Sequence, residues 1–431
     1  MIPTPLATAG FVYPVTVPMD GFRDQQRYDA HQEAMRNSRR AKQRAEARST
    51  QRRRRVIAVS ILLLPVAIAA FAFTWSRSSP SPKPRQAETT ATLPDQSAAE
   101  QAVGGRVPMP NHVRGVHVTS YAVATPDLFE PIIRLADPNI GMNAIQIDVK
   151  DERGEIAFST PIPLAKKDGA QMDIYDPVKV LRRAHDAGLY TIARIVTFQD
   201  GYAPSADSSI ALHNRQGGLW RNNLGITWLD PTNEKAWEYP IDVAKYAAEL
   251  GFDEVMFDYV RYPTDGNAAD MVFKDPGRPR QDTITSFLKQ ASSELKPLGV
   301  HVSAAMFGLA ATDDLGIGQW PGKVRNVLDA VYPMVYPSHF TDGQFGIAKP
   351  GDTPGPTVAA ALSDWRRKTN GGTVQIRPWL QDFTLGGITY GPKEVKEQIA
   401  AAERTGATGW LLWNAQCIYS PGVFEGTNGQ P

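Results

Sequence analysis

The chain has 431 residues, enough for one large domain or two ordinary ones. Its 46 basic and 45 acidic residues give a formal net charge of +1, which argues against a general nucleic-acid-binding protein. The single cysteine, Cys417, excludes an intramolecular disulfide, so any folded domain depends on its hydrophobic core for stability.

The first 110 residues form three segments of different composition. Residues 1–55 are polar, basic and poor in large apolar groups, which predicts a largely disordered tail. Residues 56–75 carry no charge over roughly the 20 residues that a bilayer core requires. A buried core helix is the alternative for this stretch. Residues 76–110 are rich in Ser, Pro, Ala and Thr and predict a linker.

The charge beside the apolar segment predicts its orientation. A block of Arg and Lys residues, 36–55, lies on its N-terminal side, and basic residues stay in the cytoplasm. We therefore expect a single-pass cell-membrane anchor with a cytoplasmic N-terminus and an extracytoplasmic domain at 111–431. A regulatory role for the basic tail, in contact with anionic lipid or a cytoplasmic partner, is a further alternative.

From residue 113 onward, short apolar runs alternate with amphipathic segments. The predicted strands are 113–121, 143–150, 190–198, 254–260, 301–308, 329–336, 374–382 and 409–414. The clearest predicted helices are 177–187, 233–250, 283–295, 357–368 and 392–406, and several end in Gly. Eight alternating units predict an α/β fold, a (β/α)₈ TIM barrel. A doubly wound open sheet is the alternative, although no G-x-G-x-x-G motif is present.

The last predicted unit is incomplete. Only 17 residues follow Asn414, and they show no helical period. We expect the eighth helix to be short or missing and the barrel to be covered there by other means.

Polar residues gather at the predicted C-terminal ends of the strands, where TIM barrels place their active sites. Asp258 is the most informative, because a carboxylate within a buried strand costs about 5 kcal/mol without compensation. An ion pair with Arg194 or Arg261 is the structural alternative. The residues expected to line this rim are His117, Asp148, Arg194, Asp258, Arg261, Tyr262, Tyr336, His339, Trp379, Gln381, Asp382, Trp413 and Asn414.

Carboxylates, arginines and flat aromatic rings on one rim are typical of a sugar-binding cleft, because pyranose faces stack on rings and hydroxyls need donors and acceptors. Glycosidic cleavage also needs two carboxyl groups. Motifs of zinc peptidases, P-loop NTPases and α/β-hydrolases are missing from the sequence, and the seven His are scattered. We therefore expect no metal and no cofactor.

Several segments carry a family resemblance. "VRGVHVTSY", "NAIQIDVKDERGEIAF", "IARIVTFQD", "YPMVYPSHF" and the stretch from Trp228 to Gly266 resemble the "putative glycoside hydrolase" domain of bacterial extracytoplasmic TIM-barrel proteins, which are distantly akin to α-amylase-type barrels. The resemblance spans about residues 113–416. It implies a (β/α)₈ fold, with Asp258 as the leading catalytic carboxylate and Asp148 on a second family motif. The Glu that ends the fifth strand of many related barrels has no counterpart in "HVSAAMFG".

Together these features predict a membrane-anchored extracytoplasmic glycoside hydrolase acting on a cell-wall or extracellular polysaccharide. Asp258 is the expected nucleophile or electrostatic stabiliser, kept ionised by Arg194 and Arg261. Asp382 is the first candidate for the general acid and Asp148 the second. The alternative is a non-catalytic glycan-binding or scaffold protein of the cell envelope that binds its ligand at the barrel mouth. The absence of an acid in the fifth predicted strand favours this alternative.

Overall fold

The computed structural model describes residues 105–385 and 387–425, which all belong to one compact unit. The predicted tail, the predicted membrane anchor and most of the predicted linker lie outside these ranges. Among the helices that the structure describes, none combines the length and apolar character needed to cross a membrane.

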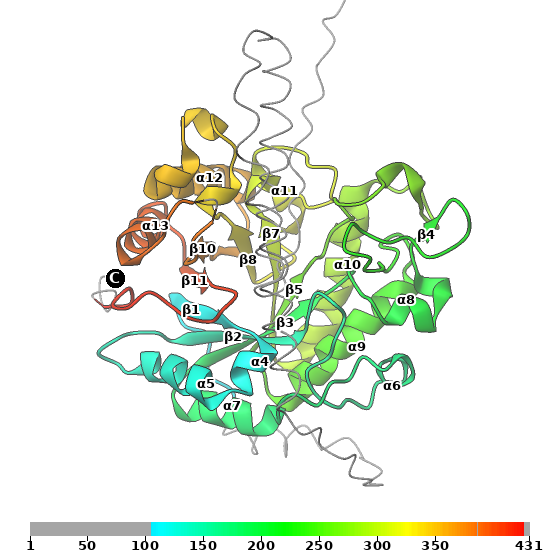
Figure 1. Ribbon diagram of the computed structural model, residues 1–431, viewed down its shortest axis with the longest axis horizontal. Coiled ribbons are helices and arrows are strands. Elements are labelled where there is room, and N and C mark those ends of the chain that lie inside the picture. Colours follow the sequence, from blue (N-terminus) through cyan, green and yellow to red (C-terminus); the bar gives the residue numbers. More distant parts are fainter. Residues whose placement is uncertain (1–104, 386, 426–431) are drawn as a thin grey trace, which may run out of the picture. The chain divides into compact units, whose positions relative to one another are not determined.

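Eight parallel strands close into a barrel (Figure 1). They are β1 (Val113–Val118), β2 (Ala144–Lys150), β3 (Tyr190–Val196), β5 (Glu254–Asp258), β7 (His301–Phe307), β8 (Ala330–Met334), β10 (Trp379–Gln381) and β11 (Gly409–Trp413). Closure is direct, because β10 pairs with both β8 and β11, and β11 pairs with β1. This order is that of a TIM barrel and confirms the predicted fold over the open-sheet alternative.

Two further details complete the strand inventory. The seventh predicted strand consists of two pieces, since β9 (Gln375–Ile376) pairs with β8 and is separated from β10 by Arg377 and Pro378. Proline donates no backbone hydrogen bond, which interrupts the ladder. Outside the barrel, β4 (His213–Asn214) and β6 (Met271–Val272) form a small antiparallel pair in the loops after β3 and β5.

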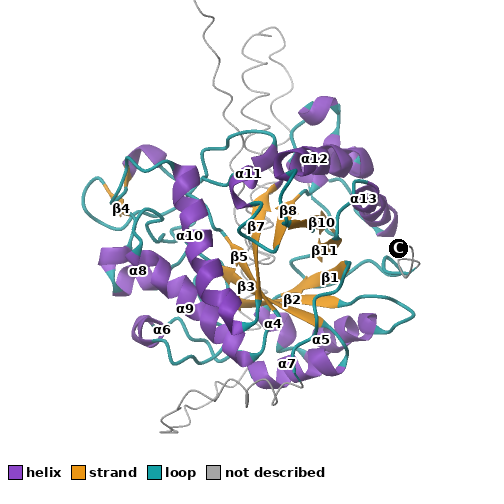
Figure 2. Cartoon of the chain, turned by 180° about the vertical axis from the view of Figure 1, so that it is seen from behind, coloured by secondary structure: helices purple, strands orange, loops and turns teal. Residues whose placement is uncertain are grey.

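Helices surround the barrel on its outside (Figure 2). The α-helices are α4 (Ser120–Val123), α5 (Pro126–Ile133), α6 (Pro163–Asp168), α7 (Pro177–Asp186), α8 (Ala203–Ala206), α9 (Lys235–Leu250), α10 (Arg280–Leu295), α11 (Pro321–Val324), α12 (Pro354–Thr369) and α13 (Pro392–Arg404). Short 3₁₀ turns lie at Arg134–Ala136, Ser208–Ile210, Ala268–Asp270, Lys296–Leu298, Gly308–Ala311, Pro337–His339, Gln344–Gly346 and Pro350–Asp352. The longest predicted helices are present, and α9 ends at Gly251, whose φ of 105° is left-handed as expected for a C-terminal glycine.

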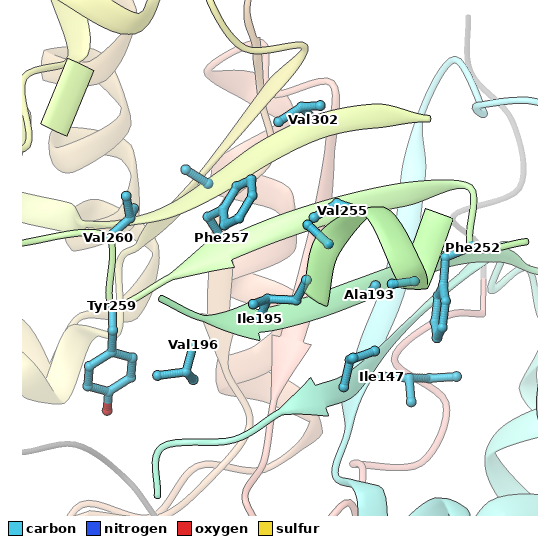
Figure 3. Close-up of a cluster of buried hydrophobic side chains, with 14 of the residues drawn as sticks. Ile147, Ala193, Ile195, Val196, Phe252, Val255, Phe257, Tyr259, Val260 and Val302 are labelled. Atoms are coloured by element: carbon cyan, nitrogen blue, oxygen red, sulfur yellow. The ribbon is translucent and has the colours of Figure 1, made fainter. Parts of the chain in front are cut away.

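Strand side chains alternate between the helix layer and the barrel interior. Figure 3 shows Ile147, Ala193, Ile195, Val255 and Phe257 in the buried cluster of apolar side chains to which the outer helices also contribute. Because successive residues of a strand point to opposite faces, the residues between them point into the barrel. The alternation therefore brings polar residues of β2, β3 and β5 into the interior.

The amino-terminal end of the barrel interior is filled by a buried polar network. Glu254 of β5 accepts hydrogen bonds from the hydroxyls of Tyr190, at 3.0 Å, and Tyr332, at 2.8 Å. Arg377 Nη1 lies 2.9 Å from a Glu254 oxygen, and both side chains are fully buried. Ser303 adds a further donor at 2.5 Å. A buried carboxylate is tolerated here because a guanidinium and several hydroxyls satisfy it.

The C-terminal segment replaces the eighth helix. Within the described range up to Glu425 no helix follows β11, in agreement with the sequence. Instead, Val423 and Phe424 are buried, and the ring of Phe424 lies 5.2 Å from that of Trp410 in β11. Cys417 is also buried, as expected for a small packed side chain.

The Glu254–Arg377 pair provides a test of the barrel's stability. We expect Arg377→Met to lower the free energy of unfolding by about 3–5 kcal/mol, because it leaves a buried carboxylate without its cation. Adding Glu254→Gln should restore at least ~1 kcal/mol of that loss. Chemical denaturation of the two single variants and the double variant measures these free energies of unfolding. Purely additive effects of the two substitutions would contradict a direct Glu254–Arg377 ion pair.

Candidate active site

Three neighbouring strands carry the central residues of the barrel mouth. Asp148 of β2 is in register with Arg194 of β3, and Asp258 is the last residue of β5. All three side chains are buried. The strands thus bring together one cation and two carboxylates that lie far apart in the sequence.

Arg194 is the hub of this group. Its Nε donates to Asp258 Oδ2 at 2.8 Å, and its Nη1 donates to Asp148 Oδ1 at 3.0 Å. Its Nη2 lies 2.7 Å from Asp258 Oδ2 and also donates to Glu152. Burial opposes the charge of the guanidinium, but the three carboxylates raise the pKa of Arg194 well above its usual value. The sequence expectation that Arg194 pairs with Asp258 is therefore met by the geometry.

Asp148 is held in its ionised form. Its Oδ2 lies 3.1 Å from His117 Nε2, and its Oδ1 accepts from Gln146 Nε2 at 3.1 Å. Burial alone would raise the pKa of Asp148, but His117 and Arg194 hold it well below its usual range. The imidazole of His117 stacks on the indole of Trp413, with ring centres 3.9 Å apart. The Trp413 ring also lies 5.1 Å from the Arg194 guanidinium carbon.

The residue after Asp258 has an unusual backbone. Tyr259 has a φ of 48°, a left-handed conformation that is uncommon for a bulky residue. In this conformation its backbone N–H donates to Asp258 Oδ1 at 2.7 Å. Backbone strain of this kind costs on the order of 1–3 kcal/mol and is concentrated at functional sites. Both oxygens of Asp258 therefore accept hydrogen bonds, one from Arg194 and one from the Tyr259 backbone.

Tyr336, from the loop after β8, lies beside the same group. Burial raises the pKa of its hydroxyl well above the usual value, and the negative charge of Asp258 raises it further. Its ring packs edge-to-face against Phe383 at 5.5 Å and His339 at 5.1 Å. Burial lowers the pKa of His339 to about 3, so this imidazole is neutral near pH 7.

Three buried polar atoms around the cluster have no hydrogen-bond partner among the described residues. They are Nδ1 of His117, Oε1 of Gln146 and Nε1 of Trp413. All three side chains are more than nine-tenths buried. Because buried polar atoms are nearly always paired, these three indicate a place for a polar ligand or water.

Asp382 and its neighbours join two loops. Asp382 Oδ2 accepts from the Ser420 backbone at 2.8 Å, and its Oδ1 accepts from the Ser420 hydroxyl at 2.7 Å. Burial raises the pKa of Asp382, and the bonds from Ser420 oppose this shift. Asn414 donates to the backbone oxygens of Asp382, at 2.5 Å, and Ile418, at 2.6 Å. These contacts attach the C-terminal segment to β10.

Gln381 and Trp379 also have structural surroundings. Gln381 accepts from the Ser338 hydroxyl at 2.9 Å and donates to the Phe383 backbone oxygen at 2.8 Å. Trp379 is buried against Trp413, with ring centres 5.3 Å apart. The rim residues Trp379 and Trp413, expected to offer open faces for sugar stacking, are thus buried. Within residues 105–385 and 387–425, the exposed large apolar side chains are Tyr121, Val272 and Ile418.

Arg261 and Tyr262 lie in the loop after β5. Arg261 Nη1 donates to the Tyr262 backbone oxygen and to the Thr264 hydroxyl, each at 3.1 Å. Its guanidinium carbon lies 5.0 Å from the ring centres of Tyr259 and Phe307, and burial lowers its pKa. The cation that bonds directly to Asp258 is therefore Arg194, and Arg261 packs among rings instead. Tyr262 packs against Phe273, 5.2 Å away.

The sequence reasoning gave Glu152 and Gln146 no role in this group, although Glu152 directly follows the second predicted strand. Glu152 lies in the turn after β2, outside the regular strand, so strand alternation could not assign it a direction. Gln146 occupies the inward position two residues before Asp148, and that spacing was the available signal. No three His, Cys, Asp or Glu side chains of the described ranges are grouped in a way that would hold a metal ion.

Comparison with protein families gives one match. The model of a family described as "Putative glycosyl hydrolase domain" matches residues 115–419. The chain belongs to this family. The match covers the whole barrel from β1 to the C-terminal segment, and membership supports a hydrolase that acts on glycans.

Comparison with solved structures agrees with the barrel fold. The chain is 14% identical to the glycoside hydrolase domain of PgaB (BpsB) from Bordetella bronchiseptica, with a TM-score of 0.51, covering 70% of this chain and 94% of that one. It is 35% identical to a hypothetical protein from Ruminiclostridium thermocellum, with a TM-score of 0.41, covering 44% of this chain and 96% of that one. None of the curated proteins compared with the chain matches it significantly.

The ionised state of Asp148 predicts a pH-dependent stability. We expect Asp148→Asn to lower the free energy of unfolding by about 3–5 kcal/mol near neutral pH, because it breaks a buried ion pair. The pKa of Asp148 is lower in the folded than in the unfolded chain, so its stabilisation is present above about pH 4 and is lost as the pH falls further.

Denaturation of wild type and variant between about pH 6 and about pH 3 measures this difference. The gap between the two should narrow as the pH falls. Asp242→Asn, on the outer helix α9, serves as the matched control. A gap that stays constant over the whole range would contradict the assigned charge state.

Proposed function

We propose that this chain hydrolyses glycosidic bonds of a polysaccharide, with Asp258 as nucleophile or electrostatic stabiliser. The observation that carries the proposal is the Asp258 carboxylate at the end of β5. It accepts hydrogen bonds from Arg194 Nε and from the Tyr259 backbone, and its Oδ2 lies 2.7 Å from Arg194 Nη2. This geometry fixes the Asp258 carboxyl group in place, as a group that must meet a developing positive charge has to be. Family membership supports the reaction class.

The two candidates for the second carboxyl group differ in their surroundings. Asp148 is kept ionised by His117 and Arg194, which suits charge stabilisation better than proton donation. Burial raises the pKa of Asp382, which suits a proton donor, but both its oxygens are engaged by Ser420. Asp148 therefore acts together with Asp258 in stabilising positive charge on the substrate. Asp382 is the weaker candidate for contact with substrate.

A non-catalytic glycan-binding role is the second candidate. The end of β7 carries Phe307 and Gly308 where many related barrels have an acid, and this observation favours binding without turnover. The two proposals agree on the barrel mouth as the glycan site. They differ in whether new reducing ends appear.

An assay of the full-length chain separates them. We expect the wild type to release reducing ends from at least one of amylose, cellulose, β-mannan, chitin and peptidoglycan. Asp258→Asn should lower that rate by about 10³-fold or more, because it removes the charge that faces the reacting carbon. Asp242→Asn on α9 should leave it unchanged.

Binding to one of these polymers with no release of reducing ends would overturn the hydrolase in favour of the glycan-binding protein. Full activity of Asp258→Asn would overturn the assignment of Asp258.

We also propose that residues 56–75 anchor the chain in the cell membrane, with the N-terminus in the cytoplasm and the barrel outside. The uncharged stretch and the Arg-rich block before it support this orientation. In such a location the substrate is a cell-wall or extracellular polysaccharide.

Fractionation of cells tests the anchor. The full-length chain should remain with the membranes after a high-salt wash, since salt removes only electrostatic attachment. Deletion of residues 56–75 should move it to the soluble fraction. Membrane association that survives the deletion, or a soluble full-length chain, would contradict the proposal.

A further inference from the structure

Tyr121 is an exposed aromatic side chain at the edge of the barrel mouth. It belongs to α4, which begins two residues after β1 ends, so it lies at the carboxyl-terminal end of that strand. The exposed fraction of Tyr121 is 54%, whereas the rings of Trp379 and Trp413 are buried. Aromatic rings bind the apolar faces of sugars by stacking, and this requires an accessible ring face. Tyr121 therefore offers what the buried tryptophans do not.

The hydroxyl end of this ring is held by Glu155. The Tyr121 hydroxyl donates to Glu155 Oε2 at 3.5 Å. The other carboxylate oxygen, Oε1, accepts from the hydroxyl of Tyr202 at 3.2 Å. Burial and the charge of Glu155 raise the pKa of Tyr202 to about 12, so this hydroxyl keeps the proton that it donates. One carboxylate thus joins two tyrosine side chains by their polar ends.

The three side chains come from the loops after three neighbouring strands. Tyr121 follows β1, Glu155 lies in the turn after β2, and Tyr202 follows β3. The backbone of these loops is fixed as well, since Asp151 Oδ1 accepts from the Glu155 N–H at 2.9 Å and Asp200 Oδ1 accepts from the Tyr202 N–H at 2.8 Å. Rings that are held before a ligand arrives lose less freedom on binding, which favours affinity.

The C-terminal segment adds an exposed apolar side chain to the same part of the rim. The Thr119 backbone N–H donates to Cys417 Sγ at 3.4 Å, and the Tyr419 hydroxyl donates to the His117 backbone oxygen. These contacts place the segment along the end of β1. Ile418 lies between the two contact residues of the segment and is 61% exposed.

Polar atoms without partners lie on the strands below this part of the rim. Among the described residues, Nδ1 of His117 on β1, Oε1 of Gln146 on β2 and Nε1 of Trp413 on β11 have none. Sugars carry apolar ring faces and hydroxyl edges, so they need apolar contacts and hydrogen-bonding atoms side by side. Strands β11, β1 and β2 and the loops that follow them supply both. This observation is independent of the exposure of Tyr121.

The patch lies away from the Asp258 carboxylate. The barrel order is β1, β2, β3 and β5, so three strand spacings of about 4.8 Å separate β1 from β5, or roughly 15 Å along the barrel wall. A single sugar ring is too small to contact both places. A ligand that meets Asp258 and Tyr121 together is therefore a chain of several sugars.

We propose that Tyr121, Tyr202 and Ile418 form a binding surface for sugar units beyond the one at Asp258, so that the substrate is a long polysaccharide chain. The inference rests on the proposed function. The Tyr121 ring stacks on a sugar face, and Ile418 contacts C–H groups beside it. Glycan chains that are too short to reach the patch lose these contacts and are poorer substrates.

The test compares two substrates of different length with the full-length chain. They are a trisaccharide and an octasaccharide of whichever polymer the wild type cleaves among amylose, cellulose, β-mannan, chitin and peptidoglycan. The wild-type kcat/KM should be at least about 10-fold higher on the octasaccharide, because remote contacts contribute to the transition state. Tyr121→Ala should lower kcat/KM on the octasaccharide by about 5–10-fold, as loss of a stacking contact does. On the trisaccharide the change should stay below about 2-fold.

Two further variants complete the design. Tyr121→Phe keeps the ring and should remain within about 2-fold of the wild type on the octasaccharide. Val272→Ala is the matched control, since Val272 is an exposed apolar residue of the loop after β5 that lies outside the patch. It should leave both rates unchanged. Thermal denaturation should give the wild-type midpoint for all three variants, because the substituted side chains are exposed.

The outcomes separate this inference from the proposed function. If the wild type cleaves the octasaccharide and Tyr121→Ala keeps its full rate, the binding surface is wrong and the hydrolase stands. Equal losses on both substrates, or a loss of the same size in Tyr121→Phe, would also overturn the surface.

A chain that binds the polymer without cleaving it would overturn the hydrolase alone. The same variants are then compared by the Kd of the octasaccharide, which Tyr121→Ala should raise by about 5–10-fold. An unchanged Kd would overturn the surface. If the wild type neither binds nor cleaves any polymer of the panel, both the proposed function and this inference fail.

Discussion

The buried guanidinium of Arg194 is the interaction on which the barrel mouth depends. Its donors reach Asp148 on β2, Glu152 in the next turn and Asp258 at the end of β5. The indole of Trp413 lies over it, so water has little access to the ion pairs. In a site of low polarity these contacts are strong and directional, and they fix each carboxylate before any ligand arrives. Loss of Arg194 would leave three buried carboxylates without their common partner.

The two ends of the barrel interior use buried charge differently. At the amino-terminal end, Glu254 faces Arg377 and hydroxyl donors, so one acid is matched by one cation. At the mouth, three acids share Arg194. The first arrangement is complete without any other molecule, which suits stability. The second gathers several ionisable groups in one buried place, which is typical of a functional site.

Strand alternation made much of this predictable. The eight strands were recognisable as apolar runs between amphipathic segments, and Asp258 was visible as an acid at a strand end. The partnership of Arg194 with Asp258 also followed from the residue types. The structural surroundings of Gln381 and Asp382 did not, because they depend on Ser338 and Ser420 in distant loops.

Other features depend on geometry outside regular elements. Glu152 follows β2 in a turn whose backbone accepts a hydrogen bond from Gln199, and no sequence period predicts this contact. The left-handed backbone of Tyr259 is similarly invisible, since bulky residues rarely adopt it. The packing of Arg261 against Phe307 was not predictable either, because Arg261 lies in the loop after β5 and Phe307 is the last residue of β7.

The missing acid of β7 has a physical explanation in the same region. Phe307, at the end of β7, packs against Arg261, and its backbone N–H donates to Gln319 at 2.8 Å. A Cβ on Gly308 would come within 2.5 Å of the Met334 backbone oxygen, so a longer side chain has no room there. The Gly308 carbonyl also accepts from Trp365 at 2.8 Å. With this strand end filled by packing, an acid has no room there, so any second catalytic carboxyl group comes from another loop of the barrel mouth.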